Sequence, residues 1–238
     1  MKVIILAAGL GTRLRPLTTN IPKCLFKLSK DQTIIGRMVN IIKKISDSPV
    51  YVVTGFMHEK IEGQLAGVEF VHNPFYRVTN SIVSLWFARE HLDDDVIIIN
   101  SDIVIQAPIF EEVLKIEHPA AVLIDSSKAR TADYKVATYN DRVIMMSKEL
   151  TANSGEYVGI TKLSRAAAGS LKQKIEEMVK NDQIDEWYEN ALVNMILDDD
   201  FDLNYVDVSH LQWVEIDTVD DLLMARKICD MERSGNDV

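Results

Sequence analysis

Short apolar runs alternate with amphipathic stretches in the first half of the chain. The apolar runs have the length of β-strands and cover residues 3–8, 50–53, 68–72 and 96–100. Over residues 33–45, apolar side chains recur at helical spacing with basic side chains turned outward, which predicts a covering helix. A second helix is expected over residues 81–91. Strands and helices in this order predict parallel β-α-β units.

The rhythm changes beyond residue 120. Four strand-like segments follow in quick succession, at residues 122–125, 134–139, 143–146 and 157–161. Their spacing, with turn residues such as Asn140-Asp141, predicts a mixed or antiparallel portion of the sheet. A helix from Ser164, a strand pair near residues 205–208 and 213–216, and an amphipathic helix from about Val219 complete the pattern. The fold class is therefore α/β, with a mixed, mostly parallel central sheet flanked by helices.

Length and composition fit one domain over residues 1–238. The chain is 47% hydrophobic, and no Pro/Gly/Ser-rich linker or internal repeat divides it. A chain of this size buries enough surface to fold without a disulfide, so Cys24 and Cys229 are expected to be free thiols. The longest apolar run, residues 3–10, is far shorter than the roughly 20 residues that span a bilayer. No signal-peptide cleavage site follows it, so we expect a cytoplasmic protein without a membrane partner, whose residues 234–238 fray.

Charge and motif content exclude several classes of function. The net charge of −10 argues against a protein that coats nucleic acid or an anionic membrane, although it leaves room for a small anion held locally. The five histidines lack the spacing of a zinc site. No Gly-x-Ser-x-Gly elbow marks a serine hydrolase.

A glycine-rich loop directly follows the first predicted strand. It reads Leu6-Ala7-Ala8-Gly9-Leu10-Gly11-Thr12-Arg13-Leu14. Small residues at the end of a strand let backbone N–H groups approach a phosphate. A dinucleotide fingerprint needs a glycine in place of Leu14, and a P-loop needs Gly-Lys-Ser/Thr, so both motifs are excluded. Arg13, Arg15 and Lys23 make the loop a local anion site; the plain alternative is a surface loop with ordinary charges.

The segment from Leu6 to Thr18, with Pro22-Lys23, resembles the signature of nucleotidyltransferases that join a nucleoside triphosphate to a phosphorylated small molecule and release pyrophosphate. Within that superfamily the chain resembles the phosphocholine cytidylyltransferases and their relatives acting on aminoethylphosphonate. Residues 80–85, 187–190 and 215–218 carry this narrower resemblance. It implies a Rossmann-like nucleotidyltransferase fold, in which about residues 1–115 bind the nucleotide and about residues 116–238 shape the acceptor pocket.

The same resemblance assigns roles to single residues. Nucleotide binding is implied for Leu6, Ala7, Ala8, Gly9, Gly11, Thr12, Arg13, Lys23 and Ser81. Among these, Lys23 would bridge the attacking and departing phosphates, and Arg13 would neutralise the leaving pyrophosphate. Lys148 is implied to contact the acceptor phosphate, with an exposed strand-end charge as the alternative.

Two aspartates are candidates for the catalytic metal. Asp102 and Asp217 each follow a predicted strand, at the edge where open α/β sheets place their ligands. Mg²⁺ prefers carboxylate oxygens and commonly takes only one or two from protein. The resemblance implies that these two side chains bind Mg²⁺; a turn or helix-cap role is the alternative for each.

An aromatic and acidic segment suggests the acceptor. Asp185, Trp187, Tyr188 and Glu189 combine groups that attract an ammonium ion, and Tyr76 is a further candidate for the same pocket. The alternative is a helix start in which Trp187 packs inward and the acids face the positive end of the helix dipole.

The preferred hypothesis is a Mg²⁺-dependent cytidylyltransferase that transfers CMP from CTP to a small phosphorylated or phosphonylated amine. One alternative keeps the chemistry and takes a sugar 1-phosphate as acceptor. A second is a regulatory protein that binds nucleotide on this fold without catalysis. A homo-oligomer is compatible with the sequence.

Overall fold

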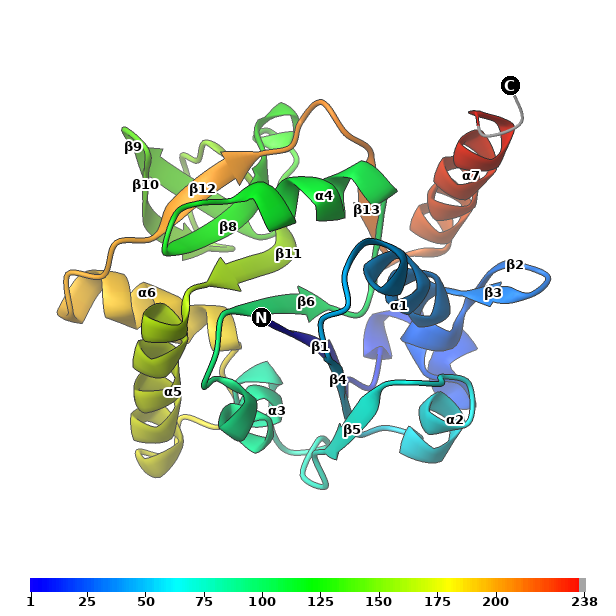
Figure 1. Cartoon of the computed structure of the whole chain (residues 1–238), viewed down its shortest axis with the longest axis horizontal. Helices are drawn as coiled ribbons and strands as arrows, with labels where there is room; N and C mark the ends of the chain where they lie inside the picture. Colours follow the sequence, from blue (N-terminus) through cyan, green and yellow to red (C-terminus); the bar gives the residue numbers. More distant parts are fainter. Residues whose placement is uncertain (236–238) are drawn as a thin grey trace.

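The computed structural model describes residues 1–235 and centres on one nine-stranded sheet (Figure 1). The sheet order is β5-β4-β1-β6-β11-β8-β12-β10-β9. Its strands are β1 (Lys2–Ala7), β4 (Val50–Thr54), β5 (Glu69–His72), β6 (Val96–Asn100), β8 (Ala120–Asp125), β9 (Lys135–Tyr139), β10 (Arg142–Ser147), β11 (Gly155–Leu163) and β12 (Asn204–Asp207). Two small sheets pair β2 (Lys27–Ser29) with β3 (Gln32–Thr33) and β7 (Ile103–Ile105) with β13 (Trp213–Glu215).

Helices cover both faces of the large sheet. They are α1 (Ile34–Ile45), α2 (His58–Glu62), α3 (Ser81–Phe87), α4 (Ala107–Lys115), α5 (Arg165–Lys180), α6 (Tyr188–Asp198) and α7 (Val219–Gly235). Short 3-10 turns are η1 (Thr12–Leu14), η2 (Leu17–Thr19), η3 (Lys23–Leu25), η4 (Arg89–His91) and η5 (Ser126–Lys128). Within residues 1–235, no helix is both long enough and apolar enough to cross a membrane. Of the tail expected to fray, residues 236–238 lie outside the described part.

The predicted α/β fold with a mixed sheet is confirmed. Strands β5, β4, β1 and β6 run parallel, whereas β11 lies antiparallel to β6 and β8, and β10 antiparallel to β9 and β12. Strand β1 shows why the first half reads as continuous apolar runs: Ile4 and Leu6 pack towards α3, α5 and α6, while Val3 and Ile5 pack towards α1 and α4. A strand buried on both faces has no polar side to alternate with.

One predicted pairing is wrong, and its correction concerns the site. Residues 205–208 and 213–216 were expected to pair with each other, but β12 joins β8 and β10 while β13 pairs antiparallel with β7. A third apolar cluster, which includes Val104, Val214 and Ile228, packs this second sheet against α7. Short strands carry no local signal of their partner, because pairing is set by contacts far away in sequence.

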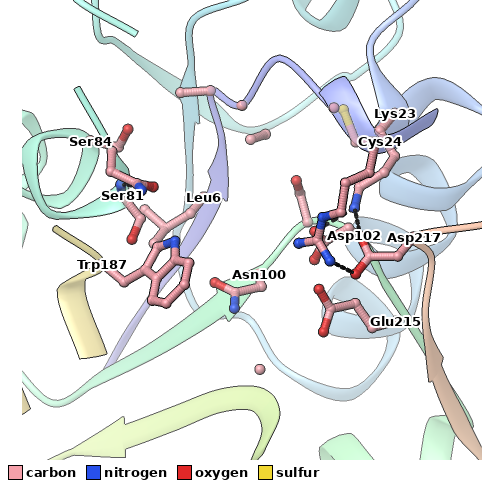
Figure 2. Close-up of a pocket in the computed structure, with 18 of the residues that line it drawn as sticks. Leu6, Lys23, Cys24, Ser81, Ser84, Asn100, Asp102, Trp187, Glu215 and Asp217 are labelled. Carbon is pink, nitrogen blue, oxygen red and sulfur yellow. Dashed lines mark hydrogen bonds and ion pairs between the residues drawn. The ribbon is translucent and has the colours of Figure 1, made fainter. Parts of the chain in front are cut away.

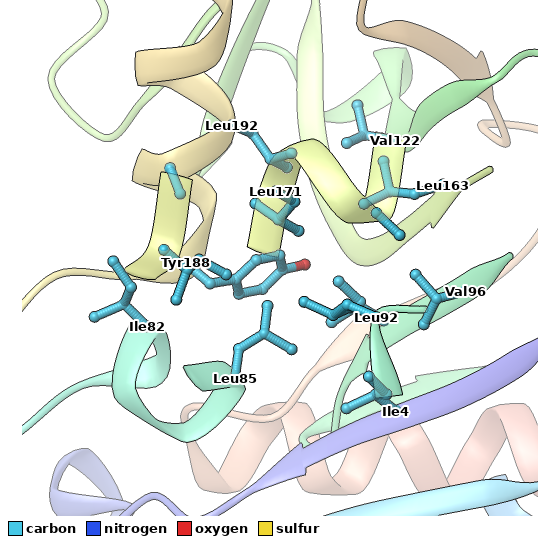
Figure 3. Packing of buried hydrophobic residues seen from close by; sticks show 14 of the residues in the cluster. Ile4, Ile82, Leu85, Leu92, Val96, Val122, Leu163, Leu171, Tyr188 and Leu192 are labelled. Atoms are coloured by element: carbon cyan, nitrogen blue, oxygen red, sulfur yellow. The ribbon is translucent and has the colours of Figure 1, made fainter. Parts of the chain in front are cut away.

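Tyr188 belongs to the core and not to the acceptor pocket for which it was a candidate. Its side chain is 0% exposed among residues of α3, α5 and the sheet (Figure 3). The hydroxyl lies 2.6 Å from the Tyr157 hydroxyl and 3.2 Å from Thr161 Oγ1. A buried phenol needs such partners, since an unpaired hydroxyl in an apolar interior costs free energy. Tyr188 therefore fixes the start of α6 to β11.

Tyr188→Phe should lower the free energy of unfolding by about 1–2 kcal/mol, because it removes hydroxyl contacts and keeps the ring. Tyr188→Ala should cost roughly 3–5 kcal/mol through the cavity it leaves. Urea denaturation of both variants measures the difference. Equal losses for the two would show that the ring contributes little.

Candidate active site

A cavity of about 300 Å³ opens at the carboxyl ends of β1 and β6 (Figure 2). Most sequence-predicted site residues line it, namely Leu6, Ala7, Ala8, Gly9, Gly11, Thr12, Arg13, Lys23, Tyr76, Ser81, Asp102, Lys148, Trp187, Glu189 and Asp217. Trp187 stands on one side and the group of Lys23, Asp102 and Asp217 on the other, with Asn100 between them (Figure 2). The two halves of the chain therefore meet over one space.

The glycine loop forms the wall beyond β1. Gly11 adopts a φ of +61°, and a Cβ there would lie 3.1 Å from Thr18 Cγ2 and 3.3 Å from Lys23 Cβ, so the tight turn requires glycine. A Cβ built on Gly9 meets nothing within 4 Å. In the described part of the chain, no carbonyl or side chain accepts a hydrogen bond from the Gly9, Leu10 or Gly11 amide. These amides remain free for an anion.

Asp102 and Asp217 are brought together by the pairing of β7 with β13. Glu215 lies opposite Ile103, and the Ile216 amide donates to the Asp102 carbonyl at 2.9 Å. Both carboxylates then reach Lys23, whose Nζ lies 2.9 Å from Asp102 Oδ2 and 3.0 Å from Asp217 Oδ1. Arg13 contacts the second oxygen of Asp217.

The charge balance of this group is set by burial and by the carboxylates. Burial alone would lower the pKa of Lys23, but Asp102 and Asp217 outweigh it and raise that pKa above its ordinary value, so the ammonium stays charged. Burial also raises the pKa of the adjacent Cys24 thiol to about 12, which leaves this thiol protonated and unreactive at neutral pH.

The aspartates fit a divalent cation. Asp102 Oδ1 is buried and has no hydrogen-bond partner among the described residues, so one hard oxygen is available inside the cavity. The residue that caps α7 is Thr218 and not Asp217, because Thr218 Oγ1 accepts from the Asp221 amide at 3.2 Å while Asp221 accepts from the Asp217 and Thr218 amides at 3.0 and 2.7 Å. Residues 1–235 contain no cluster of three or more metal-ligating side chains. Two carboxylates suffice for Mg²⁺, which takes its other ligands from phosphate and water.

The opposite wall combines aromatic rings with a buried carboxylate. Trp187 is 37% exposed, and the Tyr134 ring stands edge-on to it with the centroids 5.8 Å apart. Glu189 is buried and accepts a hydrogen bond of 3.3 Å from Asn100 Nδ2. Burial raises the pKa of Glu189 to about 7, against the hydrogen bond from Asn100, which favours the charged form.

Two residues predicted to bind the acceptor lie outside the cavity, and several residues that line the cavity were not predicted from the sequence. Asp185 is exposed and does not line the cavity, and Tyr188 is in the core. Asn100, Asp133, Tyr134 and Glu215 line the cavity without having been predicted. Asn100 ends a strand at the same edge as Asp102, so the rule that found Asp102 could have found it. Asp133 and Tyr134 follow an irregular segment and gave no signal.

Glu189→Gln should stabilise the protein at high pH and not at low pH. With a folded pKa of about 7 against an ordinary 4.5, the folded state holds the proton more tightly than the unfolded state, so stability falls as pH rises through this window. The variant lacks that loss and should gain up to about 3 kcal/mol over the unmodified protein between pH 4.5 and 8. Urea denaturation at pH 4.5 and at pH 8 measures this difference in the free energy of unfolding. The variant Glu149→Gln, at an exposed position, is the control. A gain independent of pH would contradict it.

Comparison with known proteins identifies the family. The model of the MobA-like NTP transferase domain matches residues 3–195. Choline-phosphate cytidylyltransferase of Streptococcus pneumoniae is 35% identical over 100 residues, which cover 41% of this chain and 43% of that protein, less than half its length. CTP:phosphoglutamine cytidylyltransferase of Campylobacter jejuni is 23% identical over 249 residues, 93% of this chain and 98% of that protein.

A solved structure shows the same fold. The CTP:phosphocholine cytidylyltransferase structure from S. pneumoniae superposes with a TM-score of 0.76 at 22% identity, over 96% of this chain and 98% of that one. The family match covers most of the chain, including the glycine loop, Lys23, Asp102 and Trp187. The chain therefore belongs to the MobA-like NTP transferase family and is a nucleotidyltransferase.

Proposed function

We propose that this enzyme is a Mg²⁺-dependent cytidylyltransferase. It would transfer CMP from CTP to a small phosphorylated or phosphonylated amine and release pyrophosphate, in the cytoplasm. The observation that carries the proposal is one cavity whose two walls suit the two substrates. The nucleotide wall has a glycine loop with free amides beside Lys23, Asp102 and Asp217, and the acceptor wall has aromatic rings beside a buried carboxylate. The choice of CTP is supported by relatives named as cytidylyltransferases.

In this reaction an oxygen of the acceptor phosphate attacks the α-phosphorus of CTP while the bond to pyrophosphate breaks. Mg²⁺, held by Asp102 and Asp217, would supply charge neutralisation for the triphosphate. The free amides of Gly9, Leu10 and Gly11 would bind phosphate oxygens, and Arg13 would neutralise the leaving pyrophosphate. No covalent intermediate with the protein is needed, because positioning and charge carry the chemistry.

Lys23 is the central catalytic residue of the proposal. Its ammonium is held charged between the two aspartates and is fixed by η3, which begins at Lys23 itself. A lysine placed there can follow the negative charge that moves from the attacking to the departing oxygens. Without substrate, its partners are the same carboxylates that would bind the metal. Metal and triphosphate would therefore exchange with an existing set of ion pairs.

The aromatic wall distinguishes the proposed acceptor from a sugar phosphate. The face of Trp187 and the carboxylate of Glu189 would attract an ammonium ion, the former by roughly 0.5–2 kcal/mol. Removing either side chain should have little effect on the binding of a sugar phosphate, because its sugar part carries no positive charge. A sugar 1-phosphate acceptor remains the alternative, and substrate tests separate the two.

Pyrophosphate release should occur with Mg²⁺, CTP and an amine-bearing acceptor. The assay compares CTP, UTP, GTP, ATP and dTTP against phosphocholine, phosphoethanolamine, 2-aminoethylphosphonate, glycerol phosphate and glucose 1-phosphate. Lys23→Ala should lower kcat by about 10²-fold or more, the loss expected for one transition-state charge contact. Turnover with glucose 1-phosphate alone would contradict the proposed acceptor, and tight CTP binding without any turnover would contradict the proposed catalysis.

Gly9→Ala and Gly11→Ala should separate ligand binding from folding. Alanine at Gly9 has room and should leave Tm unchanged while raising the Kd for CTP at least tenfold, because the methyl group intrudes on the phosphate site. Alanine at Gly11 is strained and should lower the free energy of unfolding by about 1–2 kcal/mol. Thermal unfolding and calorimetric titration measure both. Unchanged CTP affinity in Gly9→Ala would place the phosphates elsewhere.

A further inference from the structure

An internal ion pair lies against the exposed tryptophan of the acceptor wall. Lys148 Nζ is 2.6 Å from Asp133 Oδ2 and 5.0 Å from the centroid of the Trp187 ring. The lysine is therefore a cation over the aromatic face that the proposed function gives to the substrate amine. The protein itself shows that a positive charge is accommodated at this ring.

The same carboxylate oxygen serves a second cation across the cavity. Arg13 Nη1 lies 3.7 Å from Asp133 Oδ2, so this oxygen faces one cation from the nucleotide wall and one from the acceptor wall. Asp133 is also fixed through its backbone, since its amide donates to Glu156 Oε1 at 2.9 Å. Asp133 can thus stay in place while its two cations move.

Substrate binding upsets this balance. Under the proposed function, Arg13 turns to pyrophosphate and Lys148 to the acceptor phosphate. Each of these cations then binds a phosphate oxygen instead of Asp133, and Asp133 is left facing the cavity without a cation. A carboxylate left unpaired in a partly closed site disfavours the complex that leaves it so. An acceptor that carries an ammonium group restores the pairing. Its phosphate binds Lys148 in place of Asp133, and its ammonium binds Asp133 in place of Lys148.

We propose that Asp133 determines acceptor specificity by binding the substrate ammonium against Trp187 once phosphate has taken Lys148 and Arg13. This inference rests on the proposed function and adds to it a selection rule: an acceptor must carry both an anionic phosphate or phosphonate and a cationic amine. An acceptor with phosphate alone is disfavoured by the carboxylate it leaves unpaired.

Other carboxylates of the cavity suit this role less well. Glu189 is buried and already accepts a hydrogen bond from Asn100, and a pKa raised by burial to about 7 leaves it only partly charged at neutral pH. Glu215 ends β13, two residues before Asp217, and so lies on the side of the cavity proposed for the metal. Asp185 is outside the cavity. Asp133 is half-exposed, so the preference it confers is expected to be about tenfold rather than a thousandfold, because solvent screens the interaction.

The test compares each amine with a neutral molecule of the same shape. Phosphocholine is paired with 3,3-dimethylbutyl phosphate, and phosphoethanolamine with propyl phosphate. Calorimetric titrations with α,β-methylene-CTP and Mg²⁺ present give the ratio of Kd values within each pair for the unmodified protein, Asp133→Asn and Asp133→Glu. Asp141→Asn, an exposed turn residue, is the matched control.

The unmodified protein and Asp141→Asn should bind the amine of at least one pair about tenfold more tightly than its neutral partner. Asp133→Asn should reduce that ratio to within threefold by weakening amine binding alone, and Asp133→Glu should restore most of it. A ratio unchanged in Asp133→Asn, or no preference in the unmodified protein, would overturn the inference. Pyrophosphate release by the same samples is scored separately: selective binding without turnover would refute the proposed reaction and leave Asp133 as the amine-binding residue.

Discussion

The antiparallel pairing of β7 with β13 is the contact on which the site depends. It joins residues more than a hundred positions apart and places Asp217 beside Asp102, with the Ile216 amide bonded to the Asp102 carbonyl. Lys23 then lies between two carboxylates instead of one, and Arg13 reaches across from the glycine loop. The apolar packing of Val104 and Val214 against α7 stabilises this pairing from behind. A small second sheet therefore sets the charge pattern of a cavity formed mainly by the large one.

The cavity is electrostatically complete before any substrate arrives. A chain of contacts runs from Lys148 through Asp133 and Arg13 to Asp217 and Lys23, with cation and carboxylate alternating along it. Each cation that the proposed reaction needs for phosphate is held in place by an acid. At its most enclosed point, Lys23 between Asp102 and Asp217, this arrangement keeps the charges paired, which an isolated cationic pocket would not. Binding of an anionic substrate is then an exchange of partners, and its selectivity depends on which acids are left behind.

Local sequence patterns predicted most of the fold. They did not predict which distant strands pair, or which side chains at the start of α6 face the cavity. The parallel strands and the covering helix over residues 33–45 follow from periodicity, and the glycine loop, Lys23 and Asp102 follow from motif and position at a strand end. The strand that pairs with β13 could not be predicted from the sequence, because pairing depends on residues far away along the chain. Asp185, Trp187, Tyr188 and Glu189 were grouped by composition, but α6 begins at Tyr188 and successive helical residues point about 100° apart. One run of neighbours cannot all face the same pocket.

The late position of β13 has a consequence for synthesis. Ribosomes deliver the glycine loop, Lys23 and Asp102 first, and the parallel half of the sheet can form around them while the rest of the chain is still being made. Until residues 213–217 emerge, β7 lacks its partner and Lys23 has one carboxylate in place of two. A nascent chain would thus carry the glycine loop proposed to bind phosphate without the second of the two carboxylates proposed to bind the metal. Under the proposed function, the residues that would bind the nucleotide are therefore synthesised well before the residue that completes the catalytic group.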